Sequence, residues 1–195
     1  GYGRIAVPFA EKKMTEITCH AKGVHHLFPE ARTIIDVGGQ DSKAIRVDEE
    51  GTVYDFVMND KCAAGTGRFL EVMAKALELK NDELGAIALS SRDPAAISSV
   101  CTVFAESEVV SLRGEGKQRE DIVAGIHNAI ASRINTMIAQ IGFEEPIVLT
   151  GGVAKNQGLL RALANELKRT ISVPDHPQLT GALGAALIAS TDCKL

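Results

Sequence analysis

The first third of the chain changes from a helical to an alternating pattern of hydrophobic and polar positions. Over 11–28 the apolar residues recur at three- and four-residue steps, which predicts an amphipathic helix. These residues are Met14, Ile17, Ala21 and Val24. The segments 33–47 and 48–60 instead carry β-branched and alternating runs around a Gly-Gly pair and a second turn at Gly51. They predict three strands in an antiparallel meander.

The rest of the chain is mostly helical in pattern, with two short apolar runs between the helices. A long helix over 119–141 and a shorter one over 64–79 each carry one apolar face. The two faces consist of Phe69, Leu70, Met73 and Leu77, and of Ile122, Ile126, Ile130, Ile134, Met137 and Ile141. Further helices are predicted over 82–89, 102–113, 156–168 and 181–190, and strands over 146–152 and 171–174. Strands followed by alternating helices and strands are typical of an α/β layer architecture.

The composition narrows the class of protein. Of the 195 residues, 45% are hydrophobic and 24% are charged, as in an ordinary globular domain, and the net charge is −4. Aromatic residues make up only 4%, which argues against a stacking surface for single-stranded nucleic acid. Because the net charge is negative, we expect no nucleic-acid partner and no electrostatic attraction to an anionic membrane. The sequence shows no bilayer-length apolar run and no signal-peptide pattern, so we expect a cytoplasmic location.

The segment DVGGQDSK, residues 36–43, has the composition of a phosphate-binding turn. Backbone amides at Gly38 and Gly39 carry no side chain, so an anion can approach them closely. Asp36 at the strand end is a candidate to hold Mg²⁺ through water, and Gln40 and Asp41 are candidates to orient an attacking water. The alternative is an ordinary β-hairpin with a Gly-Gly turn, and this segment alone does not decide between the two.

A second glycine pair follows the later apolar run, in VLTGGVAKN, residues 148–156. Gly151 and Gly152 end a predicted strand, and a helix opens near Asn156, an arrangement that suits a nucleotide. An ordinary strand-to-helix turn is the alternative for this segment on its own. Two such motifs in this order, separated by a helical block, are typical of the actin, heat-shock-protein and sugar-kinase class of ATPases.

The four cysteines, Cys19, Cys62, Cys101 and Cys193, form no CxxC pair, so they do not fit a zinc ribbon or a thioredoxin motif. Cys62 and Cys101 each precede a predicted helix, whose N-terminus favours the thiolate that binds metals. Two thiolates cannot complete a four-ligand iron–sulfur site, but a two-fold dimer duplicates them. The pair therefore predicts either a shared cluster or no cluster.

Five segments together resemble the activator ATPases of 2-hydroxyacyl-CoA dehydratases, in the BadF/BadG/BcrA/BcrD-type ATPase family. They are VGGQDSK, MNDKCAAGTGRFLEVMA, SSVCTVFAESEV, GIHNAIASRI and LTGGVAKNQG. The resemblance implies an α/β fold of the actin, heat-shock-protein and sugar-kinase (ribonuclease H-like) type that binds ATP or ADP with Mg²⁺. It also implies a homodimer that shares a [4Fe-4S] cluster, held by Cys62 and Cys101 of each subunit. One electron would pass from ferredoxin or flavodoxin to a 2-hydroxyacyl-CoA dehydratase or a related CoA-ester reductase, driven by ATP.

The motifs also assign expected roles to single residues. The expected catalytic residues are Asp36, Gln40 and Asp41. The expected nucleotide-contacting residues are Gly38, Gly39, Lys43, Gly151, Gly152, Val153 and Asn156. Two alternatives stay open: a small-molecule kinase of the same fold without a cluster, and a nucleotide-binding module without turnover.

The chain opens with GYGRIAVPF and carries no strand followed by the Asp-Gly-Ser/Thr-Lys phosphate loop of this family. We therefore expect an N-terminally truncated chain with the first lobe largely missing. Residues 1–32 would be a remnant of that lobe, and 33–195 a complete second lobe whose last helix packs back toward the first.

Overall fold

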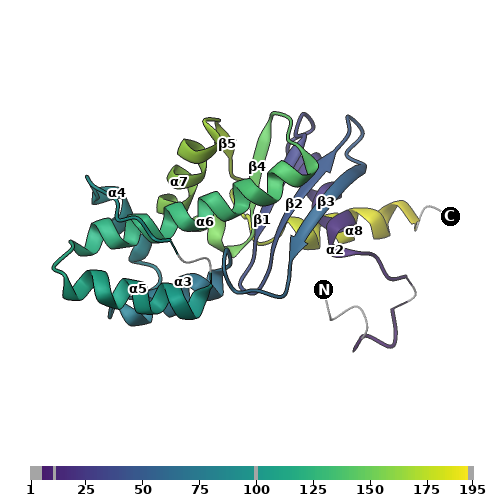
Figure 1. Ribbon diagram of the computed structural model, residues 1–195. Helices are drawn as coiled ribbons and strands as arrows, with labels where there is room; N and C mark the ends of the chain where they lie inside the picture. Colours follow the sequence, from purple (N-terminus) through teal and green to yellow (C-terminus); the bar gives the residue numbers. More distant parts are fainter. Residues whose placement is uncertain (1–5, 11, 99–100, 193–195) are drawn as a thin grey trace.

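The centre of the molecule is a five-stranded mixed sheet with helices on both faces (Figure 1). The structure is a computed structural model that describes residues 6–10, 12–98 and 101–192. The sheet has the order β3-β2-β1-β4-β5, in which β1, β2 and β3 are antiparallel, as predicted, and β4 and β5 run parallel to β1. The strands are β1 (Thr33–Val37), β2 (Ser42–Val47), β3 (Val53–Asn59), β4 (Ile147–Thr150) and β5 (Ile171–Ser172).

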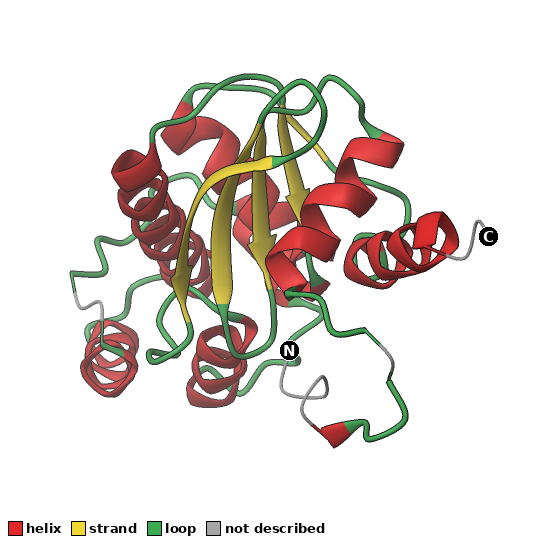
Figure 2. Cartoon of the chain, turned by 90° about the vertical axis from the view of Figure 1, so that its right-hand side faces the viewer, coloured by secondary structure: helices red, strands yellow, loops and turns green. Residues whose placement is uncertain are grey.

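Helices form a layer on each side of the sheet, and three more extend beyond it. Figure 2 shows the sheet between its two helical layers. One layer contains α6 (Arg119–Ile141) and α7 (Gln157–Leu167), and the other contains α2 (Glu16–Leu27) and α8 (Thr180–Asp192). Between β3 and α6 the chain forms α3 (Gly67–Ala76), α4 (Leu84–Ser90) and α5 (Thr102–Gly114), and a short 3₁₀ helix, η1 (Gly152–Lys155), follows β4.

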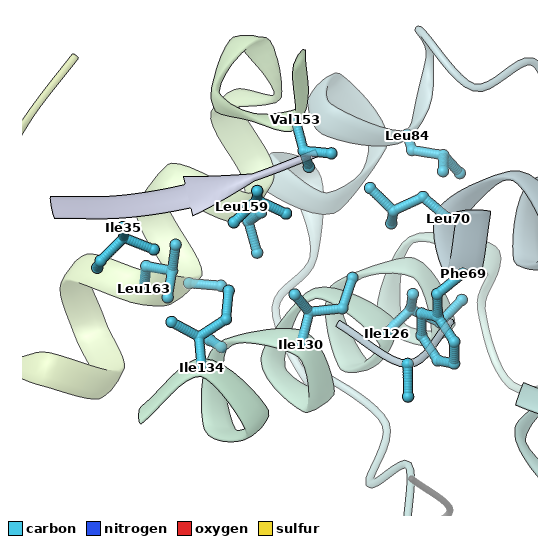
Figure 3. Packing of buried hydrophobic residues seen from close by; sticks show 14 of the residues in the cluster. Ile35, Phe69, Leu70, Leu84, Ile126, Ile130, Ile134, Val153, Leu159 and Leu163 are labelled. Atoms are coloured by element: carbon cyan, nitrogen blue, oxygen red, sulfur yellow. The ribbon is translucent and has the colours of Figure 1, made fainter. Parts of the chain in front are cut away.

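Each face of the sheet packs in its own hydrophobic cluster, because successive strand residues point to opposite sides. Ile35 packs in the cluster with α6 and α7, whereas its neighbour Ile34 packs in the cluster with α2. Figure 3 shows part of the larger cluster, to which Phe69 of α3 and Ile126 of α6 both belong. Every residue of the two apolar faces predicted for 64–79 and 119–141 is buried, which confirms both patterns.

Two helices begin three or more residues later than predicted, and local hydrogen bonds explain both. The first helix begins at Glu16 rather than residue 11, because the Thr18 N–H donates to the Thr15 hydroxyl at 3.1 Å and makes Thr15 the N-cap. The helix expected from residue 64 begins at Gly67. Thr66 is extended there, and its hydroxyl donates to the Ala63 carbonyl at 2.7 Å. The predicted strand 146–152 likewise ends at Thr150, where η1 takes over.

The last helix, α8, packs along α2, so the C-terminal helix contacts the segment assigned to a first-lobe remnant. The division at residue 32 and the truncation stay predictions, and residues 1–5 and Cys193 lie outside the described residues. Among the described helices, none combines the length and hydropathy needed to cross a bilayer.

Candidate nucleotide cleft and cysteine loop

A cleft of about 1130 Å³ opens where β1 and β4 end. These two strands are parallel, with Asp36 opposite Thr150, so the turns that follow them meet at one edge of the sheet. Both predicted glycine motifs line the cleft through Gly38, Gly39, Gly151 and Gly152. A crevice at the carboxyl ends of parallel strands is where open α/β sheets bind ligands.

The turn after β1 is tied both to itself and to helix α3. The Gly38 N–H donates to the Asp41 carbonyl at 2.9 Å, so this amide is not a free donor for an anion. The Gly38 and Gly39 carbonyls accept hydrogen bonds from the Gly67 and Arg68 amides at 2.9 and 2.8 Å. The first turn of α3 is therefore attached directly to the predicted phosphate-binding turn.

Lys43 forms the charged floor of the cleft. Its ammonium lies 2.7 Å from Glu16 Oε1, 2.9 Å from Asp41 Oδ2 and 3.1 Å from Asp36 Oδ2. Lys43 and Asp36 are each only 3% exposed. The β1–β2 hairpin explains the pairing, because Asp36 and Lys43 are direct cross-strand partners.

The electrostatics of this cluster stabilise the charged forms. Burial alone would lower the pKa of Lys43, but the carboxylates of Asp36, Glu16 and Asp41 outweigh it and raise that pKa. Burial alone would raise the pKa of Glu16, but contact with the Lys43 ammonium helps to lower it from 4.5 to about 2. The floor of the cleft is thus a fixed ion-pair network at neutral pH.

Asp36 has further partners that sequence reasoning missed. The Thr150 hydroxyl donates to Asp36 Oδ1 at 2.9 Å, and His20 Nε2 lies 3.7 Å from Asp36 Oδ2. Thr150 stands directly before the second glycine pair, so its pairing with Asp36 follows once the two strands are known to be parallel neighbours. Glu16 and His20 come from α2, and no local motif marks them.

Asp41 and Gln40, the two residues expected to orient the attacking water, differ in their position relative to the cleft. Asp41 lines the cleft and holds Lys43. Gln40 is exposed at the tip of the turn and is not among the residues that line the cleft. Its catalytic role stays a prediction.

The second glycine turn brings η1 and α7 to the cleft. Gly151 has φ of 88°, and a Cβ there would lie 2.3 Å from the Val37 carbonyl oxygen, so only glycine fits. Its N–H donates to the Pro177 carbonyl at 2.9 Å. Val153 and Asn156 line the cleft, and the Asn156 side chain caps α7 by accepting the Leu159 N–H at 3.0 Å, as expected of a helix start.

Part of the cleft wall was not predicted from the sequence. Gly85, Ala86 and Leu89 of α4 line the cleft, together with Gln178 from the loop before α8. Lys155 donates to the Gln178 carboxamide oxygen at 2.6 Å and joins two edges of the opening. These contacts depend on tertiary packing, and no sequence motif marks them.

The two predicted cluster cysteines lie outside the cleft lining, on the segments that lead into α3 and α5. Cys62 is half-buried in the loop before α3, and Cys101 is exposed as the N-cap of α5. The Asn59 carboxamide donates to the Cys62 and Ala64 carbonyls at 2.8 and 2.9 Å. Helices α3 and α5 pack together, so both cysteines belong to one helical unit (Figure 1).

Two polar atoms near these cysteines are buried without a hydrogen-bond partner among the described residues. In the described part of the chain, no group of three or more His, Cys, Asp or Glu side chains is arranged to hold a metal ion. Among the same residues, buried polar atoms without a hydrogen-bond partner include Thr102 Oγ1, next to Cys101, and Arg133 Nε. The Arg133 stem packs against Gly65 in the Cys62 loop. Unsatisfied buried groups are expected where a ligand or partner supplies the missing contact.

Comparisons with known proteins identify the family and the fold of the chain. The model of the BadF/BadG/BcrA/BcrD ATPase family matches residues 1–189. The 2-hydroxyisocaproyl-CoA dehydratase activator of Clostridioides difficile is 54% identical over 194 residues, which are 100% of this chain and 73% of that protein. A solved structure of a Clostridium difficile activator of the 2-hydroxyisocaproyl-CoA dehydratase, with bound ADPNP, superposes with a TM-score of 0.95 at 54% identity. That match covers 100% of this chain and 72% of the other.

A more distant solved structure shows the fold alone. The ethanolamine utilization protein EutJ of Carboxydothermus hydrogenoformans is 18% identical, with a TM-score of 0.54 over 87% of this chain and 53% of its own. The α/β fold is therefore the actin-like ATPase fold predicted from the two glycine motifs.

Proposed function

We propose that this chain, which belongs to the BadF/BadG/BcrA/BcrD ATPase family, is an ATP-dependent activator that donates one electron to a 2-hydroxyacyl-CoA dehydratase or a related CoA-ester reductase. The observation that carries the proposal is the pair of hydrogen bonds between the phosphate-binding turn and α3. They connect the nucleotide cleft to the helix that directly follows the Cys62 loop.

We propose that the two glycine turns, after β1 and after β4, bind the nucleotide. Both turns line the cleft. We propose that the turn with Gly38 and Gly39 binds the phosphates, and that Gly151, Gly152, Val153 and Asn156 contact the adenosine. Asp36 and Asp41 offer carboxylate oxygens, the ligands that Mg²⁺ prefers. Since Lys43 and Thr150 hold the oxygens of Asp36, we propose that Asp36 contacts Mg²⁺ through water, while Asp41 and Gln40 orient the attacking water.

The electron carrier is proposed to be a [4Fe-4S] cluster held by Cys62 and Cys101 from each of two subunits. Such a cluster supplies one-electron transfer at low potential and requires four thiolates, which a homodimer provides. Helix α5, which follows Cys101, carries three exposed apolar side chains, Val103, Phe104 and Val110. An exposed apolar surface beside the cysteine supports a dimer interface there. Ferredoxin or flavodoxin is the proposed source of the electron.

The backbone contacts between the Gly38–Gly39 turn and α3 support coupling between the cleft and the cysteines. A change in the contacts between this turn and bound phosphates would shift the Gly67 and Arg68 amides, because they donate to the Gly38 and Gly39 carbonyls. Because α3 packs against α5, the shift reaches both cysteine-bearing segments. A two-state element of this kind allows the nucleotide to drive an otherwise unfavourable electron transfer.

The direct test is the iron and acid-labile sulfide content after anaerobic reconstitution, compared with Cys62→Ala and Cys101→Ala. We expect about two irons per chain in a dimer, lost in both variants. Cys19→Ala is the matched control, because Cys19 is buried in α2, and it should keep its iron. A wild-type dimer that binds ATP but holds no iron would contradict the proposal and favour the kinase or regulatory alternatives.

A further inference from the structure

The loop between β3 and α3 carries Cys62, and one side chain, that of Asn59 at the end of β3, holds it in place. We propose that Asn59 is a positioning residue that turns backbone amides of this loop away from its own side chain, so that they donate to the sulfur atoms of a cluster bound at Cys62. The inference rests on the iron–sulfur cluster proposed above. It adds the donors for the cluster and the side chain that aims them.

The contacts of the Asn59 carboxamide determine its orientation. Asn59 Nδ2 donates both of its hydrogens, one to the Cys62 carbonyl at 2.8 Å and one to the Ala64 carbonyl at 2.9 Å. Asn59 Oδ1 accepts the Cys62 N–H at 3.3 Å. The reversed carboxamide would place an oxygen against two carbonyl oxygens, so only this orientation fits.

The same loop is tied at both of its ends. Asn59 pairs with Ser42 of β2, so the carboxamide is attached to the edge of the sheet. At the other end, the hydroxyl and the amide of Thr66 both donate to the Ala63 carbonyl, at 2.7 and 3.0 Å. The carbonyls of residues 62, 63 and 64 therefore all accept hydrogen bonds from the two ends of the loop.

This arrangement leaves three successive amides free. In a planar trans peptide the N–H points opposite to the carbonyl of the preceding residue, so the amides of Ala63, Ala64 and Gly65 point away from Asn59 and Thr66. In the part of the chain that the structure describes, none of these three amides donates a hydrogen bond. Ala64 and Gly65 are buried, where an unpaired amide is rare.

The free amides match the chemistry of the proposed ligand. Successive backbone N–H groups beside a residue of positive φ form a concavity for anions, of the kind found at iron–sulfur sites, and Gly65 has φ of 85°. The sulfur atoms of a cluster accept hydrogen bonds, and these bonds raise its reduction potential because they stabilise the extra negative charge of the reduced form. Asn59 therefore helps to set the potential at which the electron leaves.

Hydrogen exchange of the wild-type chain, before and after anaerobic reconstitution, tests the donors themselves. If the amides of Ala63, Ala64 and Gly65 donate to the cluster, they should exchange about fivefold more slowly or better once iron is bound. Equal exchange in the two forms would overturn the inference.

Two variants of Asn59 test the positioning role, with the midpoint reduction potential of the cluster, followed by electron paramagnetic resonance, as readout. Asn59→Leu keeps the branched shape without charge or hydrogen bonds, and Asn59→Asp keeps the acceptor for the Cys62 N–H but loses both donors. We expect a more negative potential in both, and the neutral leucine excludes a mere charge effect. Asp60→Ala, an exposed neighbour in the same loop, is the matched control and should keep the wild-type potential.

Each remaining outcome decides the question. Asn59→Leu with full iron and the wild-type potential would overturn the inference and leave the proposed function standing. If Asn59→Leu folds but takes up no iron, residues 60–66 of the iron-free variant should exchange faster than in the iron-free wild type, and unchanged exchange would overturn the inference. A wild-type chain that holds no iron after reconstitution would overturn the proposed function and this inference with it.

Discussion

At the scale of single residues, the floor of the cleft depends on Lys43. Three carboxylates from three elements, α2, β1 and the turn after it, surround one buried ammonium. The sequence indicated Asp36, Asp41 and Lys43, because they lie within one eight-residue motif. It did not indicate Glu16, whose contact with Lys43 exists only after α2 packs on the sheet.

Removing the ammonium should leave the carboxylates to repel one another. We expect Lys43→Met to lower the free energy of unfolding by about 3–5 kcal/mol at pH 7, as for other buried pairs that lose one partner. Urea denaturation measures the change. Lys43→Arg keeps the charge and should lose clearly less, so equal losses in the two variants would show that packing, not charge, sets the effect.

The lowered pKa of Glu16 predicts a pH dependence. A carboxylate with a pKa lowered from 4.5 to about 2 stabilises the fold above pH 4.5, and this contribution is lost as the pH falls toward 2. Glu16→Gln should therefore show a flatter fall in unfolding free energy over that range. Glu71→Gln serves as the control, because Glu71 pairs with the exposed Arg68 at the surface. Parallel curves for wild type and Glu16→Gln would contradict the assignment.

The lowered pKa of His127, a buried residue of α6, predicts a second, separate pH effect on stability. Burial lowers its pKa and outweighs the hydrogen bonds to Val123 and Asn156, which raise it. Below about pH 6.5 this histidine binds a proton in the unfolded chain but stays neutral in the folded chain. The free energy of unfolding therefore falls as the pH drops below 6.5. Unfolding measured between pH 7.5 and 5.5 should show this fall in the wild type and less of it in His127→Gln. An identical slope in both would mean that other groups cause it.

At the scale of elements, the tightest contact is the crossing of α2 and α8. A Cβ added at Gly184 would lie 1.7 Å from the Cys19 carbonyl oxygen, a backbone atom that cannot move aside alone. We expect Gly184→Ala to push the helices apart and to lower the free energy of unfolding by about 1–3 kcal/mol, as overpacking does. Its thermal midpoint of unfolding should fall accordingly. Gly114→Ala at the end of α5 meets no atom within 4 Å and should leave the thermal midpoint nearly unchanged. Similar midpoints for both variants would contradict the close crossing.

Helices with a long apolar stripe could be predicted accurately, whereas a helix start that depends on one hydroxyl contact could not. The helix predicted over 119–141 has the same ends in the structure, because its isoleucine stripe runs from end to end. The start of α3 could not be placed, because it depends on a hydroxyl contact of Thr66 rather than on hydrophobic period. The contribution of α4 to the cleft was missed for a related reason, since packing against α6 and α7 brings it there.

At the scale of the whole molecule, the proposal requires two copies joined along α5. Phe104 is 67% exposed next to Cys101, so Phe104→Glu should weaken the dimer and lower the iron content. Tyr54→Glu changes an aromatic side chain that is 73% exposed on β3, away from α5, and should leave both unchanged. Sedimentation velocity and iron analysis report the two effects. If the Phe104→Glu protein stays dimeric and keeps the iron content of the wild type, α5 does not form the dimer interface.

The central claim is that the nucleotide in the cleft changes the surroundings of the two cysteines. The most direct measurement is the rate at which a chelator removes iron from the reconstituted protein, with ADP or with a non-hydrolysable ATP analogue bound. The contacts from Gly38 and Gly39 to α3 predict clearly different rates for the two nucleotides. Equal rates, at saturating concentrations of both, would contradict the coupling between cleft and cluster.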